Sequence, residues 1–158
     1  MKLSTEIAVG ADAAEVRRRT QDLEWVLGCV PGVTVEETAD DGSCTASITV
    51  DGGEFSITMR GVAALDVDDE ADADAGDDDG AVVLRANGRD RLGTLRAAAV
   101  VRVSVTPNGG GSGDLRITLD ADLDFSGVLA APVRLHGKST IKKVMKKTAT
   151  TVATRLAR

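Results

Sequence analysis

The chain has 158 residues, and 42% of them are hydrophobic, which is enough apolar material to bury one continuous core. Its formal net charge of -6 argues against nucleic acid as a partner, because phosphate binding depends on clustered lysine and arginine. No run approaches the roughly eighteen apolar residues of a membrane-spanning helix, and nothing after Met1 resembles a signal peptide. We therefore expect one domain over residues 1–158, in a reducing cytoplasm where Cys29 and Cys44 stay free.

The N-terminal part predicts one strand followed by two short helices. Apolar and polar residues alternate from Leu3 to Val9, as in a half-buried strand. Asp12 and Glu15 are spaced like a capping box at the start of a helix that ends near Arg19. Asp22 offers a second N-cap, and Pro31-Gly32 ends the second helix in a turn.

The middle of the chain predicts only strands. Turn signals such as Asp-Gly and Asn-Gly separate six segments, at about 33 to 39, 44 to 50, 54 to 66, 81 to 88, 94 to 106 and 114 to 125. Each of the last two has one apolar and one polar face, which favours a sheet with one dry side. Gly61 lies inside the third segment, where we expect a bulge that bends the sheet.

The C-terminal part predicts one long helix. Pro132 suits its first turn, and apolar residues then recur at spacings of three and four from Ile141 to Leu156. Four lysines flank this stripe: Lys142, Lys143, Lys146 and Lys147. They either keep the helix soluble and complement its dipole, or form a surface for an anionic membrane or an acidic protein partner.

These elements predict an α+β helix-grip fold, in which a seven-stranded curved antiparallel sheet surrounds the long C-terminal helix. Aromatic residues are only 2% of the chain, so alanine and valine fill much of the concave face and a cavity between sheet and helix is expected. The residues expected to line it and bind a ligand are Phe55, Ile57, Met59, Ala63, Leu84, Ala97, Ala99, Val101, Leu119, Leu123, Phe125, Val144, Met145 and Val152.

No catalytic or metal-binding motif stands out. His136 is the single histidine and is expected at the surface or at a helix start, which argues against a histidine metal cluster or a catalytic triad. The acidic run 66–79 lacks the spacing of a calcium loop and is expected to be solvated. We predict no catalytic residue, no metal and no covalent cofactor.

An ordered set of short motifs resembles the carbon monoxide dehydrogenase G-subunit family. They are Val16, Asp22-Leu23-Glu24, Cys29-Val30-Pro31-Gly32-Val33, Gly61, Gly88-Arg89-Asp90, Gly93, Ala97 to Ala99, and Phe125-Ser126-Gly127-Val128-Leu129-Ala130. The resemblance implies the START-like (SRPBCC) ligand-binding superfamily. It further implies a non-catalytic accessory of a molybdenum-containing carbon monoxide dehydrogenase, peripheral at the inner face of the membrane, that carries an isoprenoid quinone or lipid.

Two other functions remain open at this stage. A polyketide cyclase-type enzyme uses the same architecture as a reaction chamber, but it needs inward polar groups poised for proton transfer. The concave registers offer chiefly apolar side chains, with Arg85, Asn87 and Met59 as exceptions, so a binding module is favoured over an enzyme. A generic chaperone-like interaction domain is a third, less favoured possibility.

Overall fold

A computed structural model describes residues 1–51, 53, 56–67, 81–107 and 115–156. Phe55 and nearly all of the acidic run lie outside these residues. The elements are β1 (Lys2–Val9), α1 (Ala13–Thr20), α2 (Leu23–Gly28), β2 (Val33–Thr38), β3 (Cys44–Asp51), β4 (Ser56–Val67), β5 (Ala81–Asp90), β6 (Arg96–Pro107), β7 (Leu115–Ser126), α4 (Ala130–His136) and α5 (Lys138–Leu156).

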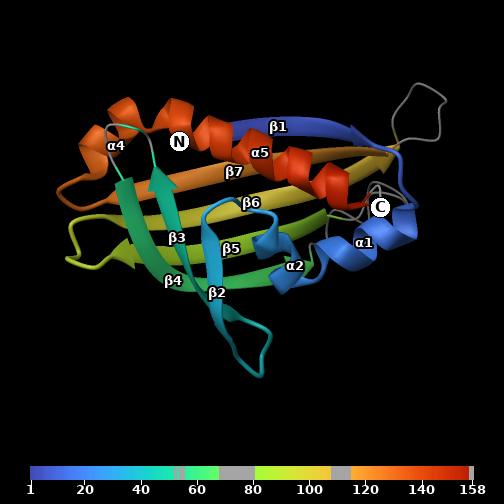
Figure 1. Ribbon diagram of the computed structural model, residues 1–158, viewed down its shortest axis with the longest axis horizontal. Coiled ribbons are helices and arrows are strands. Elements are labelled where there is room, and N and C mark those ends of the chain that lie inside the picture. The colour runs from blue at the N-terminus through green and yellow to red at the C-terminus, as the bar shows by residue number, and fades with distance from the viewer. Residues whose placement is uncertain (52, 54–55, 68–80, 108–114, 157–158) are drawn as a thin grey trace.

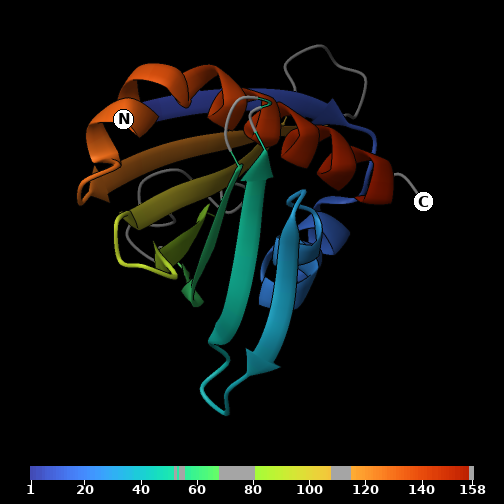
Figure 2. The same ribbon diagram turned by 60° about the vertical axis from the view of Figure 1, so that its left-hand side comes forward.

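The strands form one 7-stranded antiparallel sheet in the order β1-β7-β6-β5-β4-β3-β2. The sheet curves around α5, which lies across its concave side and contacts β1 and β7 (Figures 1 and 2). The two short helices α1 and α2 lie toward one end of α5, and α4 lies at the other end (Figure 1). The predicted α+β helix-grip architecture is confirmed, including the two short helices after β1.

The two N-terminal helices begin differently. Asp12 precedes α1, but its side chain makes no capping hydrogen bond, and the Glu15 carboxylate pairs instead with Arg18 at 2.6 Å and Arg19 at 2.9 Å. The predicted capping box is therefore wrong, because two guanidinium groups one turn away hold the carboxylate. Asp22 does cap α2: its carboxylate accepts a hydrogen bond of 3.3 Å from the backbone N–H of Trp25.

Replacing the two caps should have different consequences. Asp22→Ala should lower the free energy of unfolding by about 1 kcal/mol, because it leaves an N–H of the first turn without its partner. Asp12→Ala is the matched control and should cost much less, since the Asp12 side chain caps nothing. Urea unfolding of both variants measures the difference, and equal losses would show that the Asp22 bond has no special role.

The long C-terminal helix is confirmed as α5, but it does not begin near Pro132 as expected, because a break at Gly137 separates the short helix α4 from it. The Gly137 N–H donates to the Val133 carbonyl at 2.7 Å, and the Gly137 carbonyl accepts from the Ile141 N–H at 2.9 Å. A Cβ at this position would lie 2.6 Å from the Val133 oxygen, so only glycine permits this close approach. The break separates α4 from the straight axis of α5 (Figure 1).

The predicted bulge at Gly61 is also wrong, because the register of β4 with both neighbouring strands runs through Gly61 without a shift. Glycine is needed there for close backbone approach. A Cβ on Gly61 would lie 1.7 Å from the Asn87 carbonyl oxygen of β5. An irregularity in register instead lies at the β2 edge, between Val35 and Glu37.

The interior is packed at one end of α5 and hollow toward the other. Ala149, Val152 and Leu156, in the second half of α5, are buried against the sheet. Ile141 and Val144, in the first half, are only partly buried although they belong to the same apolar stripe. The first half of α5 therefore faces space rather than a packed core.

Candidate functional site

The sheet register explains why the interior is hollow below the first half of α5. Two neighbouring rows of paired residues cross the concave face with very small side chains: Ala46–Gly61–Gly88–Ala97, then Cys44–Ala63–Ala86–Ala99. The next row toward the packed end holds larger ones, Leu65–Leu84–Val101. Glycine has no side chain and that of alanine is a single methyl group, so these two rows do not fill the space between the sheet and α5. They form the floor of a cavity.

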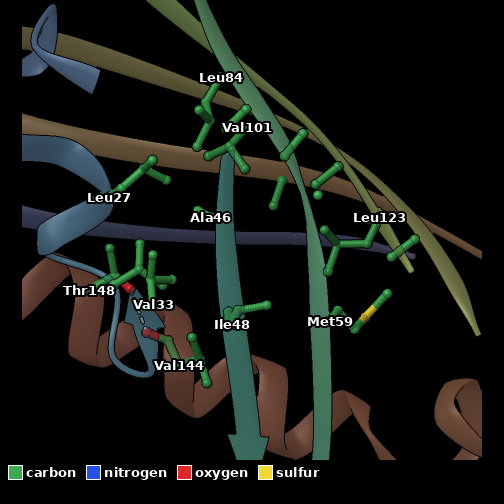
Figure 3. A pocket seen from close by; sticks show the side chains of 18 of the residues that line it. Leu27, Val33, Ala46, Ile48, Met59, Leu84, Val101, Leu123, Val144 and Thr148 are labelled. Carbon is green, nitrogen blue, oxygen red and sulfur yellow. Dashed lines mark hydrogen bonds between the residues drawn. The ribbon is translucent and has the colours of Figure 1, made fainter. Parts of the chain in front are cut away.

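The resulting cavity has a volume of about 340 Å³ and lies between the sheet, α2 and the C-terminal helices. Figure 3 shows side chains from all three sides pointing into it, among them Leu27 of α2, Leu123 of β7 and Val144 of α5. Its walls are almost entirely apolar. The volume is within the range of cavities that hold small organic ligands.

The structure places every predicted lining residue that it describes around this cavity. They come from β4 to β7 and from α5: Ile57, Met59, Ala63, Leu84, Ala97, Ala99, Val101, Leu119, Leu123, Phe125, Val144, Met145 and Val152. Phe55 lies outside the described residues. Whether any of them contacts a ligand stays a prediction.

Arg85 is a wrong candidate for the concave face. It is exposed, and its guanidinium lies 3.3 Å from the Asp66 carboxylate. The register pairs it with Ala64 and Val100, which are on the opposite side of the sheet from Leu84. Asn87 contributes to the lining but is itself exposed, so Met59 is the one of the three exceptions that is substantially inside.

Sequence reasoning missed a third wall. Trp25, Val26 and Leu27 of α2, with Val30 after it, line the cavity beside Val33 of β2. The helical spacing of α2 predicted an apolar face but not the element that this face covers. The alternation of Ala46 and Ile48 in β3 was a readable signal, because both belong to the concave register that includes Gly61 and Met59.

The two threonine hydroxyls in the lining already have hydrogen-bond partners. The Thr148 hydroxyl donates to the Val144 carbonyl of its own helix at 2.8 Å (Figure 3), and the Thr20 hydroxyl donates to the Val16 carbonyl at 2.9 Å. Arg60 is exposed, lies between Met59 and Gly61 of the concave register, and is paired with Glu36. Among the described residues, no aspartate, glutamate, histidine or lysine lines the cavity. The walls therefore suit an uncharged apolar molecule.

The thiols and the histidine make no reactive cluster. Cys29 and Cys44 are buried and free, and burial raises the pKa of the Cys29 thiol, with a smaller opposing effect from Arg155. His136 is exposed at the end of α4. Within the described part of the chain, no group of histidine, cysteine and carboxylate side chains could hold a metal ion.

The four lysines predicted as a docking surface are all exposed on α5. Lys142 and Lys146 are four residues apart, as are Lys143 and Lys147, so each pair follows one side of the helix. None of the helices in the described residues has the length and apolar character needed to cross a membrane.

Comparison with solved structures identifies the fold as START-like. A conserved protein from Geobacillus kaustophilus superposes with a TM-score of 0.73 at 15% identity, covering 99% of this chain and 95% of the other. The Zhui aromatase/cyclase from Streptomyces sp. R1128 gives 0.62 at 12% identity, covering 99% and 93%. A START superfamily protein from Mycobacterium smegmatis gives 0.59 at 13% identity, covering 98% and 96%.

The amino-acid sequence gives a more specific result than these structures. No curated protein matches the chain. The model of the carbon monoxide dehydrogenase G-subunit (CoxG) family matches residues 6–157, which is nearly the whole sequence. The chain therefore belongs to the CoxG family.

Proposed function

We propose that this protein is a non-catalytic carrier that binds one uncharged apolar molecule, an isoprenoid quinone or a lipid, in the cavity between the sheet and α5. The observation that supports this most strongly is the floor of glycine and alanine below a half-buried apolar stripe. The side chains around an apolar cavity of about 340 Å³ lack packing contacts on one side, and an apolar ligand would supply them.

The chemistry of the walls supports a ligand that is mostly hydrocarbon. A fatty acid or a nucleotide would bring a charge, and a buried charge without a partner is strongly unfavourable. A quinone ring with part of a prenyl chain, or an acyl chain, needs only apolar contact and few hydrogen bonds. The family name supports a role beside a carbon monoxide dehydrogenase. We place the carrier in the cytoplasm at the inner face of the membrane, beside a molybdenum-containing enzyme of that kind, as part of the same proposal.

A cyclase-type enzyme is the second candidate, because one structural neighbour is an aromatase/cyclase of similar length. The lining argues against it. General acid–base catalysis needs a titratable side chain within reach of the substrate, whereas Thr20 and Thr148 are bonded to their own helices and Arg60 is exposed and already paired. An enzyme would convert a bound polyketide, and a carrier would release its ligand unchanged.

Trp25 offers a direct binding assay, because it lines the cavity and is the single tryptophan of the sequence. A short-chain isoprenoid quinone should quench its fluorescence saturably, and a brominated diacylglycerol, which is an uncharged lipid, should do so if lipid is the ligand. Trp25→Phe is the control for signal from other sources. If neither compound quenches Trp25 saturably, the carrier function fails.

Substitution of the α5 lysines tests whether the carrier docks on an anionic membrane to exchange its ligand. Replacing Lys142, Lys143, Lys146 and Lys147 together by glutamine should weaken binding to anionic vesicles, and the difference should shrink with added salt because exposed charges are screened beyond roughly 8 Å at physiological ionic strength. Stability should barely change, since exposed charges contribute little. Co-sedimentation at low and high salt measures this. Equal binding by parent and variant would leave the lysines with solubility as their role.

A further inference from the structure

Large apolar side chains are exposed together at the α4 end of the molecule. The exposed fractions are 83% for Leu92 in the β5–β6 turn, 82% for Val128 and 37% for Leu129 in the β7–α4 connection, and 78% for Leu135 in α4. We name these four residues the apolar tip. Figures 1 and 2 show that the turn and α4 lie at the same end of the sheet. Large exposed apolar side chains on neighbouring segments at one end of a molecule are typical of a contact surface.

The apolar tip is held in place by hydrogen bonds rather than exposed by loose loops. The Leu129 N–H donates to the Thr94 carbonyl at 2.9 Å, which joins the two connections. Within the turn, the Asp90 carboxylate accepts from the Thr94 hydroxyl and from the Leu95 N–H at 3.1 Å. These bonds, the Thr94 one foremost, lower the pKa of Asp90.

The same segments separate the cavity from solvent. Val133 and Gly137 at α4 are buried and line the cavity, whereas Leu135 between them faces outward. In the turn, Leu95 is buried and lines the cavity, whereas Leu92 is exposed. This end wall is therefore about one layer of side chains thick, with an apolar surface on both sides.

Cations accompany the apolar tip although the protein as a whole is negative, with a net charge of -6. Arg91 precedes Leu92, Arg134 precedes Leu135, and Arg96 and Lys138 begin β6 and α5 at this end; all four are exposed. The Arg134 guanidinium also donates to the Phe125 carbonyl at 2.9 Å, which fixes it beside the strand end. Exposed apolar side chains with basic residues beside them in the chain complement the headgroup region of an anionic bilayer.

We propose that the apolar tip inserts into the surface of an anionic lipid bilayer, with the neighbouring cations on the lipid phosphates. The inserted wall then lies between the cavity and the acyl chains, so an apolar ligand crosses one side-chain layer instead of water. The lysines of α5 attract the protein to the anionic surface from a distance. The apolar tip then determines how deeply the protein inserts and how it is oriented on the bilayer. This inference rests on the proposed carrier function and extends it by assigning the end through which the ligand exchanges.

The test compares two sets of surface substitutions. The combined variant Leu92→Ser, Val128→Ser, Leu135→Ser should bind vesicles of phosphatidylglycerol and phosphatidylcholine at least about tenfold more weakly than the parent. The reason is that transfer of each exposed apolar side chain from water into the bilayer lowers the free energy. Val100→Ser is the matched control, because Val100 is 37% exposed on the opposite face of the sheet. The control should bind like the parent.

A second measurement reports insertion itself. An environment-sensitive fluorophore on Leu135→Cys should shift to the blue with anionic vesicles and much less with pure phosphatidylcholine; the native cysteines are buried and should not react. An unshifted emission, or unchanged vesicle binding by the combined variant, overturns the inference. So does a parent that dimerises through these residues without vesicles. Quenching of Trp25 by quinone in vesicle-free buffer tests the carrier function separately.

Discussion

Replacing Ala99 with phenylalanine should abolish binding of an apolar ligand while the domain stays folded. Ala99 lies in the middle of β6, paired with Ala86 and Leu123, and is half-buried at the cavity floor. A phenyl ring would project into the space below α5. In a filled core the same change would cost on the order of 1 to 3 kcal/mol through overpacking, whereas a cavity can accept it.

Fluorescence titration and thermal unfolding of Ala99→Phe separate these outcomes. Ala98→Phe is the matched control, because Ala98 is the next residue on the same strand but is exposed on the convex face. The control should keep ligand binding and a similar melting temperature. A strongly destabilised Ala99→Phe together with a parent that binds nothing would mean that the interior is a packed core.

Replacing Gly61 with alanine should cause the largest loss of stability of any variant discussed. The new Cβ would lie 1.7 Å from the Asn87 oxygen and 2.6 Å from the Gly88 Cα, and both are backbone atoms of a paired strand. Relief requires β4 and β5 to separate, so we expect a loss of about 4 kcal/mol or more. The cavity floor would be displaced with them, and ligand binding would be lost as well.

Gly88→Ala is the natural comparison, because Gly88 is directly opposite Gly61 in the register. Its Cβ would lie 3.3 Å from the Arg60 carbonyl, a tight contact that a small shift relieves. Urea unfolding should therefore show a much smaller loss than for Gly61→Ala. Similar losses for the two variants would contradict the close approach assigned to Gly61.

Much of the fold could be predicted because its signals are local. Alternation along β4, β6 and β7 indicated both the strands and their inward faces, and from them most of the predicted lining residues. The register was not readable, and it is the register that aligns Gly61 with Gly88 and Ala97 to create the floor. Gly61 was interpreted as a bulge because a glycine inside a strand can mark either a bulge or a close approach of two backbones.

Other features depend on contacts between distant segments. At the break, the carbonyl oxygen of Val133 comes too close to Gly137 to allow a Cβ there. The spacing of apolar residues along the helix gives no sign of this contact. The α2 wall requires knowing that α2 packs beside β2. The apolar tip joins Leu92 and Leu135, which are far apart in the sequence, and the hydrogen bond between Leu129 and Thr94 unites their segments only in the folded chain.

Native mass spectrometry of the purified protein, followed by organic extraction, tests the central claim most directly. We predict a protein ion that carries one non-covalently bound apolar molecule, which the solvent releases intact as a quinone or lipid. Ala99→Phe should give only the mass of the bare chain, and Ala98→Phe should resemble the parent. A parent that appears only as the bare chain, even after incubation with quinone or lipid, would contradict the carrier function.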